Sequence, residues 1–176
     1  MDIGVLTVPL GDRSLDDAVS YLDSLGVEAV EIGCGGYPGE DHLDRQSVLG
    51  DADAQADLRA TVDDHDMRVS ALATHNNPLH PDEDRASEAD TELREAIELA
   101  DQLDVNTVTC FSGLPAGGPA DEVPNWVTAP WPGEHADAHE YQWEVAVEYW
   151  TDLAAHAADH GVDVAIEMHP NMLVYE

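Results

Sequence analysis

Short apolar runs alternate along the chain with stretches whose apolar residues recur every three or four positions. The runs predict β-strands at 3–8, 27–32, 67–73, 105–111 and 162–168. The stretches between them predict four amphipathic helices, over 14–26, over 52–65, through Ala89, Leu93, Ile97 and Ala100, and through Ala146, Trp150, Leu153 and Ala157. This strict alternation is typical of an α/β fold with a parallel sheet and right-handed crossovers.

Two architectures share this order, an open doubly wound sheet and a (β/α) barrel. Polar and unusual residues follow the second, third, fourth and fifth strands, which favours the barrel, because an open sheet concentrates its ligand site at one switch point. A complete (β/α)₈ barrel needs about 250 residues, and this chain has 176. We therefore expect residues 1–176 to form a single, incomplete TIM barrel domain of five parallel strands and four helices.

An incomplete barrel leaves its last strand at an open edge. We expect Val162, Val164 and Ile166 to be uncovered there, and an exposed strand edge promotes pairing with another chain. The sequence thus predicts a homo-oligomer, or association with a partner through this edge. The sequence also leaves open whether the barrel is shortened in the gene itself.

The charge of the chain is extreme, with 6 basic residues, all arginine, against 38 acidic ones, and a net charge of −32. Such a surface repels phosphate backbones and anionic lipids, so neither a nucleic acid nor a membrane is expected as a partner. The absence of lysine together with this acidity predicts a halophilic protein. The start of the chain lacks the basic region of a signal peptide, and we expect a cytoplasmic protein.

Glu167 lies in the segment VAIEMHP, at the end of the last predicted strand. A carboxylate in such a strand is costly to bury unless a metal ion or hydrogen bonds satisfy it, and strand ends form the catalytic rim of a barrel. We therefore predict Glu167 as a catalytic residue and metal ligand, with a solvated strand-end carboxylate as the alternative. His169 is predicted to bind substrate; the alternative is a loop histidine bonded to backbone.

Further substrate-binding candidates follow the other strands. Glu31 ends the second strand before GCGGYPG, whose glycines allow close approach of a ligand or simply form a tight turn. His75 and His80 flank the third-strand loop HNNPLH, where an imidazole is well placed to bind a hydroxyl or carbonyl. Trp126 and Trp131 lie in a long loop over 113–138 and either stack on a sugar or pack within the loop.

Two other sequence features suggest chemistry only weakly. His135 and His139 have the spacing of a helical metal-binding pair, without an acidic residue placed beside them by a motif. Ser112 follows a strand, but its surroundings do not match the GxSxG elbow of a hydrolase nucleophile. Neither feature enters the predicted site.

Taken together, the segments EIGCGGYPGEDHLD, SALATHNNPLHPD, CFSGLP and AIEMHP resemble the sugar phosphate isomerase/epimerase group of xylose isomerase-like TIM barrels. The resemblance runs from the first predicted strand to the fifth. It implies a divalent metal, Mn²⁺, Mg²⁺ or a similar ion, and proton transfer next to the carbonyl of a sugar or polyol. Family members commonly bind the metal with residues of strands five to eight, and Glu167 matches the first of these ligands.

The resemblance leaves three functions open. One is a metal-dependent isomerase or epimerase in its complete form, with this chain inactive alone because the other ligands are missing. Another is a non-catalytic half-barrel that needs a partner chain. The third is a metal-dependent nuclease similar to type IV apurinic endonucleases, which the net charge of −32 disfavours.

Overall fold

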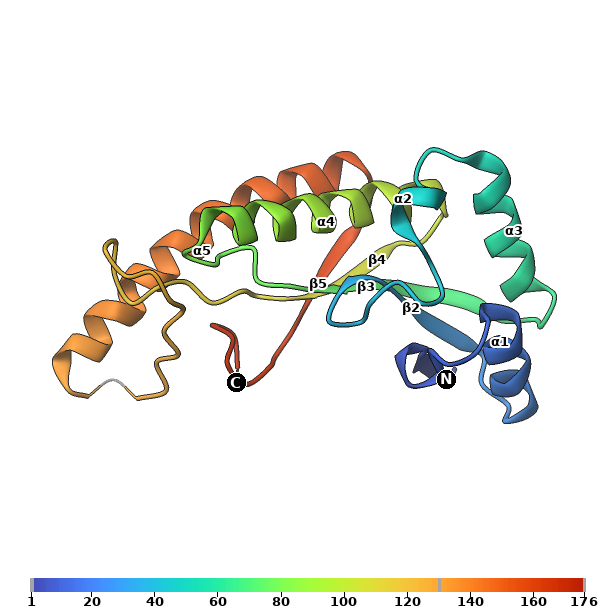
Figure 1. Cartoon of the computed structure of the whole chain (residues 1–176), viewed down its shortest axis with the longest axis horizontal. Coiled ribbons are helices and arrows are strands. Elements are labelled where there is room, and N and C mark those ends of the chain that lie inside the picture. The colour runs from blue at the N-terminus through green and yellow to red at the C-terminus, as the bar shows by residue number, and fades with distance from the viewer. Residues whose placement is uncertain (1, 130, 176) are drawn as a thin grey trace.

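The computed structural model describes residues 2–129 and 131–175. Its strands are β1 (Gly4–Leu6), β2 (Ala29–Gly36), β3 (Arg68–His75), β4 (Thr107–Phe111) and β5 (Asp163–Glu167). They form one parallel sheet in the order β1-β2-β3-β4-β5. Each predicted strand is thus present, and β1 and β5 lie at opposite edges of a sheet that stays open among the described residues (Figure 1).

The helices are α1 (Leu15–Ser24), α2 (Arg45–Val48), α3 (Ala52–Asp63), α4 (Glu83–Gln102) and α5 (Gly133–Asp159), with a 3₁₀ turn over Val8–Leu10. The prediction of four helices was therefore wrong by one. The extra helix, α2, is a single turn capped by Asp44, and it is too short to show a helical apolar period. Helix α5 also begins earlier than expected, so the long loop ends at Pro132 rather than near residue 138.

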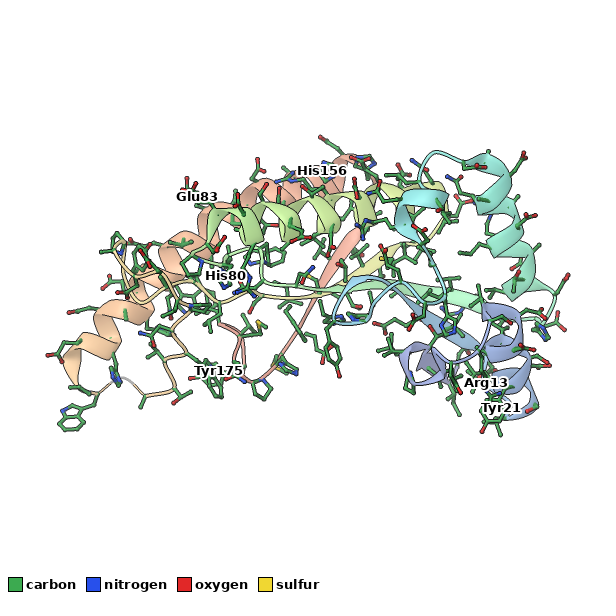
Figure 2. All side chains as sticks on the ribbon, in the orientation of Figure 1. Arg13, Tyr21, His80, Glu83, His156 and Tyr175 are labelled. Carbon is green, nitrogen blue, oxygen red and sulfur yellow. The ribbon has the colours of Figure 1, made fainter. Side chains whose placement is uncertain are left out.

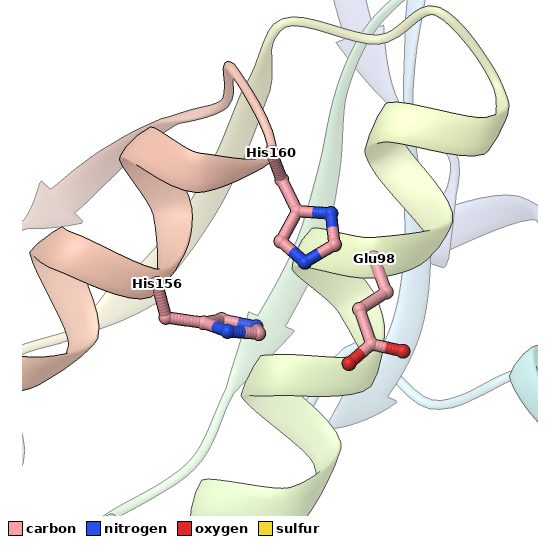
Figure 3. A group of neighbouring side chains, drawn as sticks. All are labelled: Glu98, His156 and His160. Carbon is pink, nitrogen blue, oxygen red and sulfur yellow. The ribbon is translucent and has the colours of Figure 1, made fainter.

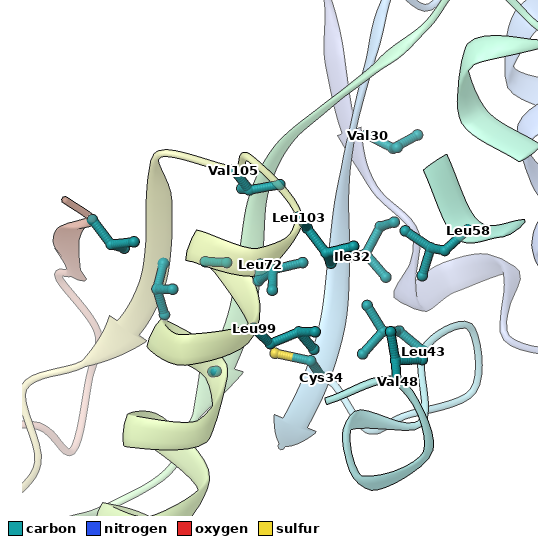
Figure 4. Packing of buried hydrophobic residues seen from close by; sticks show 14 of the residues in the cluster. Val30, Ile32, Cys34, Leu43, Val48, Leu58, Leu72, Leu99, Leu103 and Val105 are labelled. Atoms are coloured by element: carbon teal, nitrogen blue, oxygen red, sulfur yellow. The ribbon is translucent and has the colours of Figure 1, made fainter. Parts of the chain in front are cut away.

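One face of the sheet packs against the helices. Its inward residues lie in register across the strands, with Ile32 beside Leu72, Leu72 beside Val108, and Val108 beside Val164. Ile32, Leu72 and Val108 are fully buried, and Figure 4 shows strand residues of this cluster packed against Leu58 of α3 and Leu99 of α4. We call this face, with Val30, Ile32, Leu72 and Val108, the covered face.

The opposite face carries mainly small residues. Gly33, Ala73, Thr109 and Ala165 lie in register across β2 to β5. Because side chains alternate between the faces of a strand, Glu31, His75 and Glu167 lie on this same face. We call it the open face, since the helices α4 and α5 lie together on the other side of the sheet (Figure 1).

The edge strand β5 was only partly as expected. Ile166 is 38% exposed and Met168 is 62% exposed, whereas Val162 is only 5% exposed and belongs to the main core. Val164, also expected to be uncovered, is half-buried and packs against that core. Val162 is buried because its backbone N–H bonds back to the carbonyl of Ala157 at the end of α5, which turns the residue under the helix. The exposed apolar part of the edge is therefore its carboxyl end.

Cys34 and Cys110 are free and buried, and burial raises the pKa of each thiol to about 12. Among the described residues, no helix combines the length and apolar character needed to cross a membrane.

Candidate functional site

Three predicted site residues lie on the open face. His75 and Glu167 end β3 and β5, at the edge of the sheet where the carboxyl ends of the parallel strands meet. Glu31 was expected to end the second strand, which was wrong, because β2 continues to Gly36 in pairing with β3 and leaves Glu31 inside the strand. The structure brings two of them into direct contact, since Nε2 of His75 lies 2.9 Å from Oε2 of Glu167. This contact joins residues 92 positions apart in the sequence.

The two partners of this contact differ in exposure. The side chain of His75 is 4% exposed, and that of Glu167 is 55% exposed. Nδ1 of His75 is buried without a hydrogen-bond partner among the described residues, so the ring proton belongs on Nε2, where it is donated to the carboxylate. Burial lowers the pKa of His75, against the opposing charge of Glu167, and the imidazole is neutral near pH 7. Glu167 keeps an oxygen accessible to a ligand.

His169 lies at the border of this pair. The ring of Phe111 packs against both imidazoles, with ring centroids 4.4 Å from His75 and 4.5 Å from His169. Nδ1 of His169 lies 2.7 Å from the carbonyl oxygen of Pro170 and donates to it. His169 thus makes the hydrogen bond to backbone that was the alternative to substrate binding. Its Nε2 is then left as an acceptor.

Glu31 joins the open face through a different contact. The hydroxyl of Thr109 donates to Oε1 of Glu31 at 2.5 Å, and no contact among the described residues joins Glu31 directly to Glu167. The glycines that follow Glu31 approach the chain itself, because a Cβ on Gly36 would lie 2.6 Å from the carbonyl oxygen of His75. Gly36 has a φ of +62°, so the glycine holds this segment against β3.

The other three predicted substrate-binding residues lie apart from the pair. Nδ1 of His80 accepts the backbone N–H of Asp82 at 3.0 Å, and the ring lines a cavity of about 310 Å³ beside α4. Trp126 is 38% exposed and packs edge-on against Tyr175. Trp131 is 82% exposed. Among the described residues, no hydrogen bond or ion pair joins any of these side chains to Glu167.

Two polar residues that sequence reasoning missed hold the rim in place. Oδ1 of Asn77 accepts the backbone N–H of Leu114 at 2.8 Å, and its Nδ2 donates to the same residue's carbonyl at 3.0 Å, which ties the β3 loop to the β4 loop. Arg45 is buried and donates to Glu40, to Glu95 and to the carbonyl of Cys34. Arg45 is one of only 6 basic residues, and that rarity was a signal for a specific role.

Among the described residues, Glu167 does not belong to any group of three side chains that could together bind a divalent metal. The one group of three metal-ligating side chains in the described part of the chain is Glu98, His156 and His160, on the helices. Glu167 has His75 as its near neighbour, and Nε2 of that ring carries the proton donated to the carboxylate. A metal ion bound by Glu167 would therefore need further donors.

The chain is similar to known proteins over nearly its whole length. The family model described as xylose isomerase-like TIM barrel matches residues 19–175. The uncharacterized protein YfiH of Bacillus subtilis (strain 168) is 35% identical over 179 residues, which is 99% of this chain and 57% of that protein.

Solved structures share the fold at low identity. A putative xylose isomerase from Rhodospirillum rubrum has a TM-score of 0.68 and 18% identity, over 98% of this chain and 56% of its own. The IolI protein with a bound zinc atom has a TM-score of 0.65 and 20% identity, over 99% of this chain and 54% of its own. Sugar 3-epimerases are also among the similar structures.

The chain spans about half the length of the proteins that it matches. Its sheet accordingly provides five strands of a barrel that has eight in the complete fold. The chain belongs to the xylose isomerase-like TIM barrel family.

Proposed function

We propose that this chain forms one domain, the N-terminal part of a barrel that isomerises or epimerises a sugar or polyol with the help of a divalent metal. The observation that carries the proposal is the contact of 2.9 Å between His75 and Glu167 on the open face. It places a neutral hydrogen-bond donor beside an accessible carboxylate at the strand ends, where barrels of this type hold their substrates. The similarity to sugar isomerases and epimerases supports the substrate class.

The two residues suit the two needs of proton transfer next to a carbonyl. Glu167 is the group that accepts or returns the proton, because its carboxylate is exposed and lies at the strand end. His75 holds that carboxylate in place and excludes water from its buried side. Glu31 and His169 remain proposed substrate contacts on the open face beside this pair. His80, Trp126 and Trp131, which lie apart from the pair, remain proposed substrate contacts of the complete barrel.

Metal binding is proposed for the complete barrel. A bound divalent ion polarises the carbonyl oxygen of the substrate, and Glu167 is the ligand that this chain offers. The described residues do not supply the others, so we assign no step to the metal here. We expect the chain by itself to bind Mn²⁺ weakly and to be inactive.

A second candidate function is that of a non-catalytic half-barrel that associates with another chain. The carboxyl end of β5 favours it, since Ile166 is 38% exposed and lines an apolar pocket of about 150 Å³ with Trp143 and Leu173. The variant Ile166→Asp should then shift the chain from oligomer to monomer in light scattering. Leu25→Asp is the matched control, because Leu25 is 61% exposed but lies at the end of α1.

The catalytic proposal is tested with a ketose in D₂O. The measurement is the exchange of the proton on the carbon next to the carbonyl for deuterium. The chain is assayed alone, and again with the part of YfiH that lies outside the aligned 179 residues. Both assays contain Mn²⁺ or Mg²⁺. We expect exchange in the mixture and none from the chain alone.

Variants then assign the residues. Glu167→Gln should abolish exchange, and His75→Ala should lower turnover or raise KM while leaving the circular dichroism spectrum unchanged. Thr107→Val is the control, because Thr107 begins β4, whereas Phe111, the register partner of Glu167, ends it. This variant should behave as the parent chain. Exchange that survives in Glu167→Gln would contradict the proposed role of this carboxylate.

A separate proposal concerns the cause of the high negative charge. We propose that the net charge of −32 reflects a cytoplasm rich in salt rather than a charged substrate. In molar salt the Debye length falls to about 3 Å, so repulsion between surface carboxylates is screened. The salt dependence of folding tests this proposal and is treated in the Discussion.

A further inference from the structure

A second group of ligating side chains lies on the helices, away from the open face. His156 lies in the last turn of α5, His160 caps the end of that helix four residues later, and Glu98 faces them from α4. Figure 3 shows the three side chains pointing toward one another across the gap between the helices. One ligating atom from each lies within 4.8 Å of the others.

One hydrogen bond and one unpaired nitrogen suit the two imidazoles to bind a metal ion. Nδ1 of His160 lies 2.9 Å from Oδ2 of Asp101, and a carboxylate that holds the proton on one ring nitrogen leaves the other free as a ligand. Nε2 of His156 is buried and has no hydrogen-bond partner among the described residues. An unsatisfied buried nitrogen is costly, and a metal ion would satisfy it.

We propose that Glu98, His156 and His160 bind a borderline divalent ion such as Zn²⁺, which links α4 to α5. Two imidazole nitrogens and one carboxylate oxygen suit Zn²⁺, Co²⁺ or Ni²⁺, whereas Mg²⁺ and Ca²⁺ prefer all-oxygen sites. Tetrahedral Zn²⁺ with bonds of about 2.1 Å needs ligands about 3.4 Å apart. The ligating atoms already lie within 4.8 Å of one another, so binding requires only that the half-buried side chains move inward.

The position of this group makes it independent of the proposed sugar site. His160 follows the last residue of α5 and immediately precedes the turn into β5, whereas Glu167 lies at the far end of β5. Figure 2 shows His156 in the helical layer, on the other side of the sheet from Tyr175. An ion bound here would hold two helices together and would not touch a substrate on the open face.

The chain contains its own control for a histidine pair on a helix. His135 and His139 also lie one turn apart on α5, but Nε2 of His139 accepts the indole N–H of Trp143 at 3.0 Å. No three-ligand group in the described residues includes them. If spacing alone sufficed, both pairs would bind; if the facing carboxylate matters, only His156 and His160 bind.

The experiment uses the full 176-residue chain in about 3 M KCl. Calorimetry with Zn²⁺ should show one equivalent bound, Co²⁺ should give the absorption bands of a four-coordinate site, and Zn²⁺ should raise the melting temperature. His156→Ala and His160→Ala should remove the tight binding and the Co²⁺ bands. Asp101→Asn should weaken binding by about 10–100-fold through the orientation of His160.

The controls separate this site from the proposed sugar site. The double variant His135→Ala/His139→Ala and the variant Glu167→Gln should bind Zn²⁺ as the parent chain does. Each alanine variant is first checked by circular dichroism, and the Co²⁺ spectrum of the parent chain provides a readout that needs no variant. Absence of saturable binding to the parent chain would overturn the proposal. So would binding that persists without His156 and His160, or binding that disappears with Glu167→Gln.

Discussion

The two faces of the sheet are built from the same strands but from different residues. On the covered face, Ile32, Leu72 and Val108 are fully buried under helices. On the open face, the positions next to them are Gly33, Ala73 and Thr109, and the larger polar side chains of the site are Glu31 inside β2 and His75 and Glu167 at the ends of β3 and β5. The covered face therefore provides the stability of the fold, while the open face provides space and chemistry.

Salt should have the largest effect, because it acts on the charged surface outside both faces. With a net charge of −32, self-repulsion at about 0.1 M KCl extends over about 10 Å, and at about 3 M it is almost fully screened. The melting temperature should therefore be much lower in the dilute salt. Thermal melts followed by circular dichroism measure it, and equal melting temperatures would refute the halophile proposal.

A substitution on the covered face should have the next largest effect. Leu72→Ala removes a side chain that is 0% exposed and should lower the free energy of unfolding by about 2–5 kcal/mol. Leu25→Ala is the matched control, because Leu25 is 61% exposed and its loss should fall within about 0.5 kcal/mol. Urea unfolding measures both. Similar losses for the two variants would break the distinction between the covered face and the surface.

Most of the fold was predictable from the sequence because the covered face has a regular apolar pattern. The buried strands β2, β3 and β4 are short apolar runs, and α1, α3 and α4 carry apolar residues at helical spacing. What failed was local. The single turn α2 has no period to detect, and the burial of Val162 depends on a backbone bond to α5.

The candidate site was predictable in its residue types and not in its contacts. The position of His75 and Glu167 directly after strands indicated the rim, but their contact depends on sheet register. Trp131 was predicted from its residue type and its place in the long loop, and it is 82% exposed. Asn77 acts by bonding to the backbone of Leu114, which leaves no sequence pattern. The rarity of arginine marked Arg45, but its partners Glu40 and Glu95 are given only by the fold.

Substitutions at the two carboxylates beside Arg45, Glu92 and Glu95, should change the free energy of unfolding by an intermediate amount. Oε2 of Glu95 accepts from Arg45 at 2.9 Å and from Gln46 at 2.6 Å. Burial raises the pKa of Glu95, but these bonds outweigh it and the net pKa is lowered. The pKa of Glu92 is raised, because burial outweighs the charge of Arg45. The two carboxylates should therefore respond to pH in opposite senses.

The signs follow from linkage between proton binding and folding. Ionised Glu95 stabilises the fold above its unfolded pKa of about 4.3, and this stabilisation is lost as pH falls through its lowered pKa. Ionised Glu92 opposes folding at pH 7, and this cost disappears as pH falls through its raised pKa. Glu95→Gln should thus cost about 1–3 kcal/mol at pH 7 and less in acid. Glu92→Gln should cost less at pH 7 and relatively more in acid, and parallel pH slopes in urea unfolding would contradict this.

The smallest effect is expected on the open face itself. Thr109→Val keeps the shape of the side chain and removes the hydrogen bond to Glu31, so the free energy of unfolding should fall by about 0.5–1.5 kcal/mol. Thr107→Val is the control, since Thr107 lies on the same strand and face but its hydroxyl makes no hydrogen bond to the described residues. Glu31 is only partly buried, and water can replace the lost donor. A loss for Thr109→Val as large as that for Leu72→Ala would mean that the open face contributes to stability as the covered face does, and the division between them would fail.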